Sequence, residues 1–317
     1  MANLDDLLVQ EGAAPLLGYL AAHPEWSLDG VSQPMQGATN LVVVAGRGAD
    51  RVVLKLFRRS ERYQRERLAL MHWAGMGLVP RLLDEQSPRL LVMSYLPGDM
   101  LHVVRARQGE QAWLDGCQAV GEAAARLTQV ELAQETGRAY SARFYEGMGS
   151  LDRYLGRIVG LGESIHRLDA DFQDGYWGAS LGLIGDELDG ILGEPRGLYH
   201  QDASNLHLAD GRFEGFFDLE MTRVGGPTMQ IASCLRLFEF RRRAWERFAA
   251  GWVRVTGQAL DSRRVLAAGH LLAWREICRY LSYDGTPGSG YDWASPADPD
   301  WYRGLLDGLG EMLSLAV

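Results

Sequence analysis

The chain has 317 residues, of which 47% are hydrophobic and 23% are charged, with a formal net charge of -9 and a pI near 5.3. This length suits two lobes or domains better than one small core, and the composition excludes a disordered chain. The acidic balance argues against a nucleic-acid partner, because phosphate binding needs a surplus of Lys and Arg on one face. A cationic ligand is compatible with this negative net charge.

The cysteines and the N-terminal segment predict a cytoplasmic protein without a membrane partner. Cys117, Cys234 and Cys278 are far apart and are not spaced as metal ligands, so we expect buried thiols in a reducing compartment. Residues 1–6 are acidic where a signal peptide would be basic. No uninterrupted apolar run approaches the length that spans a membrane.

The first β-rich segment reads as a hairpin. Residues 41–45 and 51–57 are runs of aliphatic and β-branched side chains, which favour strands. The glycine-rich stretch 46–50 separates them and is typical of a turn.

A helix and a further strand complete the N-terminal part. Residues 60–74 place apolar side chains among charged ones and stop at glycines, as a surface helix does. Residues 89–96 are typical of a strand that ends at Pro97-Gly98. We therefore place a lobe boundary there, with an N-lobe over residues 1–96 and a C-lobe over residues 97–317.

The C-lobe is predicted to be mainly helical. From Trp113 to Leu127 apolar residues recur at steps of four and three, which indicates a helix with one buried face. Residues 141–192 and 243–283 are helical in pattern, and a closing helix is expected around residues 305–312. The predicted fold class is α+β, with a small β-rich N-lobe and a larger helical C-lobe.

One hairpin interrupts these helices and brings polar residues together. Strands are expected at residues 206–208 and 213–217. Asp202 and Asn205 precede this hairpin and Asp218 follows it, so the side chains should converge where its ends meet. Two carboxylates and an amide suit Mg²⁺, and phosphoryl transfer needs such a site together with a carboxylate that orients the attacking hydroxyl and a lysine that holds the phosphates.

Four separated blocks, in order, resemble those of the aminoglycoside phosphotransferase and choline kinase family, which has the two-lobed protein-kinase-like fold. The blocks are Gly37-Ala38-Thr39-Asn40, Val53-Leu54-Lys55-Leu56 with Glu66, Leu91-Val92-Met93-Ser94-Tyr95-Leu96-Pro97-Gly98, and Tyr199-His200-Gln201-Asp202-Ala203-Ser204-Asn205 with Asp218. The resemblance covers nearly the whole chain. It implies an ATP-dependent kinase that phosphorylates a hydroxyl of a small molecule.

The resemblance also implies which N-lobe residues hold ATP. They are Gly37, Thr39 and Asn40 in the phosphate-covering loop, Lys55 on the phosphates, Glu66 paired with Lys55, and the backbone of Ser94 and Leu96 at the adenine. Glu61 competes with Glu66 for the pairing with Lys55.

In the C-lobe the resemblance makes Asp202 the catalytic base, His200 a buttress of the catalytic loop, and Asn205 and Asp218 the Mg²⁺ ligands. The family usually places the asparagine five positions after the aspartate, whereas Asn205 follows Asp202 by three. A second register would make His207 the ligand; Asn205 is preferred because His207 falls within a strand. For Glu220 two roles stay open, that of an accessory metal ligand and that of an ion-pair partner.

Two further departures from the family's usual sequence leave an alternative function open. Related sequences commonly carry aspartates at the positions of Gly226 and Gln230, where they anchor loops. Their loss and the shorter catalytic loop are compatible with a weakened or inactive nucleotide-binding protein of the same fold. A protein-directed kinase is disfavoured, because only a few residues separate Asp218 from Pro227 and leave no room for a long activation segment.

The C-terminal segment indicates which kind of small molecule receives the phosphoryl group. Its acidic residues Asp292, Asp298 and Asp300 suit an amine-bearing sugar or a choline-like cation, while a neutral sugar or amino alcohol stays open. The aromatic residues near them either line a substrate pocket or pack within a surface loop. These are Tyr291, Trp293 and Trp301.

Overall fold

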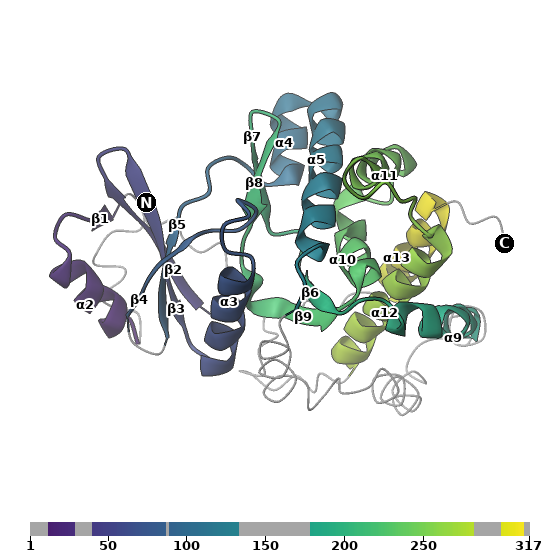
Figure 1. The fold of residues 1–317 in the computed structure, drawn as a ribbon, viewed down its shortest axis with the longest axis horizontal. Helices are drawn as coiled ribbons and strands as arrows, with labels where there is room; N and C mark the ends of the chain where they lie inside the picture. Colours follow the sequence, from purple (N-terminus) through teal and green to yellow (C-terminus); the bar gives the residue numbers. More distant parts are fainter. Residues whose placement is uncertain (1–11, 29–39, 87–88, 133–177, 282–298, 314–317) are drawn as a thin grey trace.

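The computed structural model describes residues 12–28, 40–86, 89–132, 178–281 and 299–313. They form two lobes, with a small sheet at one end of the molecule and a larger helical part at the other (Figure 1).

The N-lobe is built on an antiparallel sheet whose strands lie in the order β1-β2-β3-β5-β4. The strands are β1 Ser27–Leu28, β2 Asn40–Arg47, β3 Asp50–Phe57, β4 Leu82–Gln86 and β5 Leu90–Ser94. Strands β2 and β3 form the predicted hairpin, and β5 is the predicted strand 89–96. The helices of this lobe are α2 Ala14–Ala22 and α3 Ser60–His72, the latter matching the predicted helix.

Alternation along β3 decides which way its lysine points. Leu54 and Leu56 belong to the buried cluster that includes α2, whereas Phe57 belongs to the cluster that includes α3. Successive side chains of a strand point to opposite faces, so Lys55 shares its face with Phe57. The strand pattern therefore sends the lysine toward α3.

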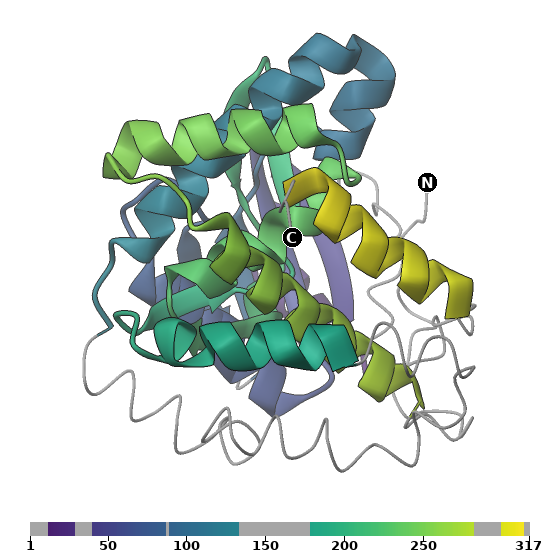
Figure 2. The ribbon, with the colours of Figure 1, turned by 90° about the vertical axis from the view of Figure 1, so that its right-hand side faces the viewer.

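The C-lobe is helical, as predicted. Its described helices are α4 Leu101–Gln108, α5 Glu110–Thr128, α9 Gly178–Leu192, α10 Pro227–Cys234, α11 Arg242–Thr256, α12 Ser262–Leu281 and α13 Pro299–Leu313. Figure 2 shows α9, α11, α12 and α13 on the side of the lobe that faces away from the sheet. The pattern over residues 243–283 is divided between α11 and α12, because Gly257 ends α11 at a φ of 68°.

Helices α5 and α11 form a close contact at the centre of this lobe. A Cβ added at Gly121 would lie 2.1 Å from the Phe248 carbonyl oxygen, and one at Gly251 would lie 2.1 Å from that of Gln118. The two glycines therefore let the helix backbones touch. Trp113, Cys117 and Phe248 are buried beside them.

Short strands interrupt the helices. The predicted hairpin is β7 Leu206–Ala209 with β8 Arg212–Phe216, and β6 Gly197–His200 pairs with β9 Thr222–Gly225. A 3-10 turn, η2 Leu219–Met221, joins β8 to β9, and η3 Leu235–Phe238 follows α10. The β6–β9 pair was not predicted from the sequence.

A partly buried hydrogen bond joins α9 to α12. The Ser180 hydroxyl lies 2.9 Å from the His270 Nδ1 atom, and Ser180 is 1% exposed. Burial lowers the pKa of His270 from its ordinary value of 6.5 to about 4. The imidazole is therefore neutral in the folded protein at neutral pH.

We expect His270 to make the folded protein sensitive to acid. The unfolded chain takes up this proton near pH 6.5 and the folded chain only near pH 4, so between these values the unfolded state binds more protons and stability falls as the pH falls. A shift of this size corresponds to roughly 3 kcal/mol. In urea unfolding, the stability advantage of the wild type over His270→Gln should shrink by about that amount between pH 7.5 and pH 4. An advantage that is equal at both pH values would contradict this.

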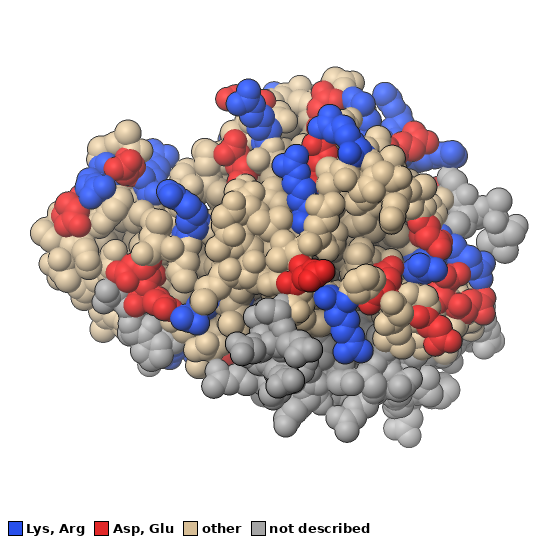
Figure 3. Space-filling view, viewed as in Figure 1, with Lys and Arg blue, Asp and Glu red and all other residues tan. Residues whose placement is uncertain are grey.

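Charges of both signs alternate over the face seen in Figure 3, without a large patch of one sign. None of the described helices combines the length and the apolar character that crossing a membrane requires.

Candidate active site

The β7–β8 hairpin brings Asn205 and Asp218 together. Its turn consists of Asp210 at φ 50° and Gly211 at φ 73°, the left-handed pair that two-residue hairpins prefer. At the open end, the Phe217 N–H donates to the Asn205 carbonyl at 2.9 Å. The Asn205 Nδ2 atom then lies 3.5 Å from the Asp218 Oδ2 atom.

The short spacing between Asp202 and Asn205 is accommodated as a tight turn. The Asn205 N–H donates to the Asp202 carbonyl at 3.0 Å, which closes four residues on themselves. The Ser204 hydroxyl donates to the Asp202 Oδ1 atom at 2.8 Å, and Asp202 is exposed. The turn thus presents the Asp202 carboxylate to solvent while it directs Asn205 toward Asp218.

The second register, with His207 in the metal position, does not describe the structure. The His207 Nδ1 atom lies 2.9 Å from the Leu96 carbonyl oxygen. Its ring packs at 4.8 Å from that of Phe217. His207 therefore contacts the end of the N-lobe sheet, and Asn205 is the side chain beside Asp218.

Lys55 is buried at the centre of a cluster of three carboxylates. Its Nζ atom is 2.5 Å from Glu66, 2.5 Å from Asp218 and 3.7 Å from Glu220. Glu66 comes from α3, which lies on the face of the sheet toward which Lys55 points. Glu61, on the same helix, pairs with Arg65 instead. Of the two glutamates weighed from the sequence, Glu66 is therefore the one at the lysine.

Burial and charge oppose each other in this cluster. Burial alone lowers the pKa of Lys55, but Asp218, Glu66 and Glu220 more than reverse this, so the ammonium is held above its ordinary pKa. Burial raises the pKa of Asp218, and the charge of Lys55 outweighs it, so the net pKa lies below the usual range. For Glu66, burial dominates and its pKa lies above the ordinary value.

Glu220 ties the two lobes together. Its carboxylate, 6% exposed, accepts hydrogen bonds from the Asn40 amide at the start of β2 and from the Arg62 guanidinium of α3. The sequence left Glu220 open between a metal ligand and an ion-pair partner, and the structure pairs it with Arg62. The place of Arg62 was missed, because helix-surface arginines are common and nothing local marks this one.

His200 is fully buried behind the catalytic loop. The centroid of its ring lies 5.7 Å from that of Phe216, at an interplanar angle of 75°. The backbone N–H of His200 donates to the Gln230 Oε1 atom at 2.8 Å. Burial lowers the pKa of His200 to about 4, against the opposite effects of Asp202 and Asp218. The imidazole is therefore neutral at neutral pH and packs against Phe216, while its role as a buttress of the loop stays a prediction.

Ser94 and Leu96, the predicted adenine contacts, make backbone contacts within the protein, and several other predicted residues lie outside the described part. The Ser94 N–H donates to the Arg81 carbonyl at 2.9 Å, and the Leu96 carbonyl accepts from His207. The predicted residues that fall outside the described part of the chain are Gly37, Thr39, Tyr291, Asp292, Trp293 and Asp298, and of Asp300 and Trp301 only the backbone is described.

Asp218 adopts a backbone conformation that aspartate enters at a cost. Its φ of 58° and ψ of 54° are left-handed, which destabilises a residue with a Cβ by about 1 kcal/mol. Its side chain is 41% exposed, whereas those of Glu66 and Glu220 are 2% and 6% exposed. Asp218 is thus the carboxylate of the cluster that solvent or a ligand can reach.

The donor set fits Mg²⁺. Carboxylate oxygens of Glu66, Asp218 and Glu220 lie within 4.8 Å of one another. Lys55 and Arg62 are the cations paired with these three carboxylates in the ion pairs above, so negative charge is in excess. Hard oxygen ligands with residual negative charge favour Mg²⁺, and Asp218 and Asn205 offer the accessible ones.

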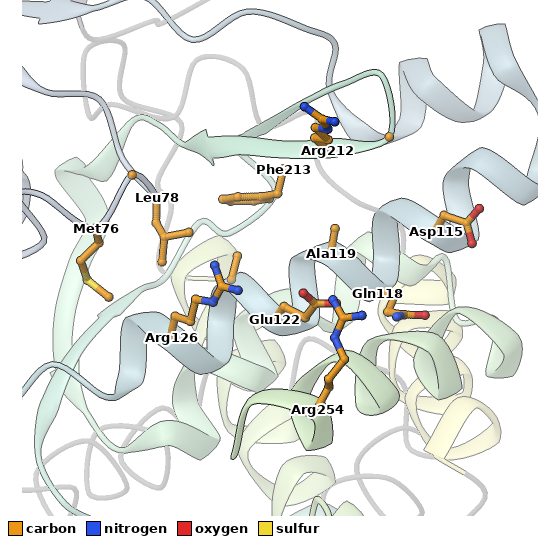
Figure 4. Close-up of a pocket in the computed structure, with 13 residues that line it drawn as sticks. Met76, Leu78, Asp115, Gln118, Ala119, Glu122, Arg126, Arg212, Phe213 and Arg254 are labelled. Atoms are coloured by element: carbon orange, nitrogen blue, oxygen red, sulfur yellow. The ribbon is translucent and has the colours of Figure 1, made fainter. Parts of the chain in front are cut away.

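A hollow in the surface lies apart from these residues. It has a volume of about 480 Å³ and lies between the connection from α3 to β4, the side of α5, the β7–β8 turn and α11 (Figure 4). Its acidic groups are paired, Asp115 with Arg247 and Glu122 with Arg254. It contains none of the predicted site residues. The lining residues are Met76, Gly77, Leu78, Asp115, Gln118, Ala119, Glu122, Ala123, Arg126, Gly211, Arg212, Phe213 and Arg254.

Comparisons with known proteins define the class. The profile of the phosphotransferase enzyme family matches residues 30–266. The chain therefore belongs to this family, and it is a small-molecule kinase with the two-lobed protein-kinase-like fold, as the sequence predicted. No curated protein matches the chain by sequence.

Solved structures share this fold at low identity. A thermostable variant of the aminoglycoside phosphotransferase APH(4)-Ia, in ternary complex with AMP-PNP and hygromycin B, is 17% identical with a TM-score of 0.63, over 95% of this chain and 99% of that one. The macrolide 2'-phosphotransferase MphH from Brachybacterium faecium is 17% identical with a TM-score of 0.57, over 93% and 97%. An ethanolamine kinase from Plasmodium vivax is 11% identical with a TM-score of 0.63, over 95% and 89%.

Proposed function

We propose that this kinase transfers the γ-phosphoryl group of ATP to a hydroxyl of a small molecule at the site between Lys55 and Asp202. The convergence of Lys55, Asn205 and Asp218 beside an exposed Asp202 carries the proposal. The AMP-PNP bound to one structural neighbour supports ATP as the donor.

Each residue has one task in this reaction. Lys55, held by Glu66, binds the phosphates, and Asp202 accepts the proton of the attacking hydroxyl. The bond between the acceptor oxygen and the γ-phosphorus forms as the bond from that phosphorus to the bridging oxygen of ADP breaks. Catalysis then rests on positioning and on neutralisation of phosphate charge.

Asn205 and Asp218 are the residues that would hold Mg²⁺ in this proposal. When bound, the ion neutralises phosphate charge and orients the nucleotide. Asp218 contacts both Lys55 and Asn205, so it links the phosphate-binding and metal-binding residues. Gly37, Thr39, Asn40, Ser94 and Leu96 stay predicted nucleotide contacts.

The acceptor in this proposal is an aminoglycoside-, sugar- or choline-like alcohol. The net charge of -9 favours a cationic one. A lobe boundary after Leu96, a cytoplasmic location and the absence of a nucleic-acid partner complete the proposal; the buried free thiols of Cys117 and Cys234 support a reducing compartment.

In a screen of aminoglycosides, sugars and amino alcohols, we expect Mg²⁺-dependent release of ADP from ATP with the compound that serves as the phosphoryl acceptor. Asp218→Asn keeps the shape of the side chain but removes the charge, so it should lose most of the Mg²⁺ dependence of nucleotide affinity in calorimetric titration. Tight nucleotide binding that is indifferent to Mg²⁺, without ADP release for any alcohol, would instead indicate an inactive binding protein.

A further inference from the structure

The helix behind the catalytic loop begins at a residue that cannot cap it. The N-cap of α10 is Gly226, which has no side chain to satisfy the first N–H groups of the helix. The carboxylate of Glu194, in the segment between α9 and β6, does so in its place. Its Oε2 atom accepts from the Thr228 N–H at 2.9 Å, and its Oε1 atom accepts from the Thr228 hydroxyl.

Glu194 and a side chain at position 226 exclude each other. A Cβ at Gly226 would lie 2.1 Å from the Glu194 Oε2 atom and 2.5 Å from its Cβ atom. The φ of Gly226 is -84°, which any residue adopts, so the backbone does not call for glycine here. Glycine is needed instead because the Glu194 side chain occupies the space that a Cβ at this position would take.

Helix α10 is fastened at both ends of strand β6, which leads into the catalytic loop. Glu194 lies just before β6 and binds Thr228. His200 ends β6, and its N–H donates to Gln230, which is fully buried on α10. Asp202 follows His200 by two residues, so these two attachments fix where the loop leaves the strand.

We propose that Glu194 and Gln230 are positioning residues for Asp202, with Glu194 acting as the N-terminal cap of α10 from outside the helix. The proposal rests on the proposed function for its catalytic consequence. Anchoring of this loop is thereby supplied by a carboxylate of another segment and by a neutral amide.

A double-mutant cycle tests this. Glu194→Gly removes the cap together with the Cβ atom that a side chain at position 226 would meet, and Gly226→Asp inserts a side chain into the space of Glu194. Each alone should lower kcat for ADP release by roughly 10-fold or more, with KM for ATP little changed. The double variant E194G/G226D gives α10 a capping carboxylate of its own in the vacated space and should recover kcat to within about 3-fold of the wild type. Asp186→Ala, which removes an exposed carboxylate of α9, is the matched control and should leave kcat unchanged.

Hydrogen exchange at the His200 N–H gives a second measurement that needs no turnover. This N–H should exchange faster in each single variant and in Gln230→Leu, and should regain its protection in E194G/G226D. If the wild type forms no ADP, the proposed function fails while this measurement still decides the anchoring. The anchoring is overturned if folded Glu194→Gly keeps wild-type kcat and His200 protection, or if the double variant is no better than the worse single one.

Discussion

Asp202→Ala is expected to reduce ADP-forming turnover by about 10²- to 10⁴-fold, the contribution of a positioned acid–base group. The Asp202 side chain is exposed and accepts a hydrogen bond from Ser204, so its loss should cost the folded protein little. Nucleotide affinity should persist, because Lys55 and Asp218 are unchanged. Steady-state kinetics with calorimetric ATP titration measures the two effects separately.

Asp210→Asn is the matched control for this variant. Asp210 is an exposed carboxylate in the turn of the same hairpin, and asparagine tolerates its left-handed backbone. Its turnover should equal that of the wild type. Full turnover by Asp202→Ala, or an equal loss in both variants, would remove Asp202 from the reaction.

Lys55→Met should lower both stability and nucleotide affinity. It leaves the carboxylates of Glu66 and Glu220 buried without their ammonium partner, and breaking a buried ion pair in this way costs about 3–5 kcal/mol. Loss of a charged contact to the phosphates should weaken ATP binding by roughly 10- to 100-fold. Urea unfolding and nucleotide titration measure the two losses.

A second substitution separates the two roles of Lys55. Lys55→Met combined with Glu66→Gln removes one buried charge and should recover much of the stability, but none of the ATP affinity. As a control, Arg67→Met breaks a partly exposed ion pair of α3 with Glu85 and should cost less than about 1 kcal/mol. If Lys55→Met were no more destabilising than this control, the buried cluster would not contribute to stability as the geometry indicates.

Local patterns explain what could be predicted from the sequence. Residues 41–45 and 51–57 are β-branched runs around a turn, and such hairpins depend on neighbouring residues alone. Asp202, Asn205 and Asp218 could be brought together for the same reason, because they flank one hairpin. Family resemblance added Lys55 and Glu66, which no local pattern distinguishes from a solvated charge.

Contacts over long sequence distances explain what could not be predicted. Asn40 and Arg62 reach Glu220 across 180 and 158 positions, so no periodicity connects them. Glu194 lies 34 positions before Thr228, so replacement of a capping side chain at Gly226 by this glutamate is invisible in the sequence. From the sequence, the loss of the usual aspartate there is compatible with a weakened protein, whereas in the structure the Glu194 side chain fills its space.

Besides the contact of His207 with Leu96, one short stretch of chain supplies several contacts between the lobes. The Phe216 N–H donates to the Leu78 carbonyl at 2.9 Å, Asp218 meets Lys55, and Glu220 meets Asn40 and Arg62. Any rotation of one lobe against the other must therefore carry these contacts with it or break them. Because the ammonium of Lys55 is held at one of them, a displacement of residues 216–220 would move Asp218 and Lys55 together.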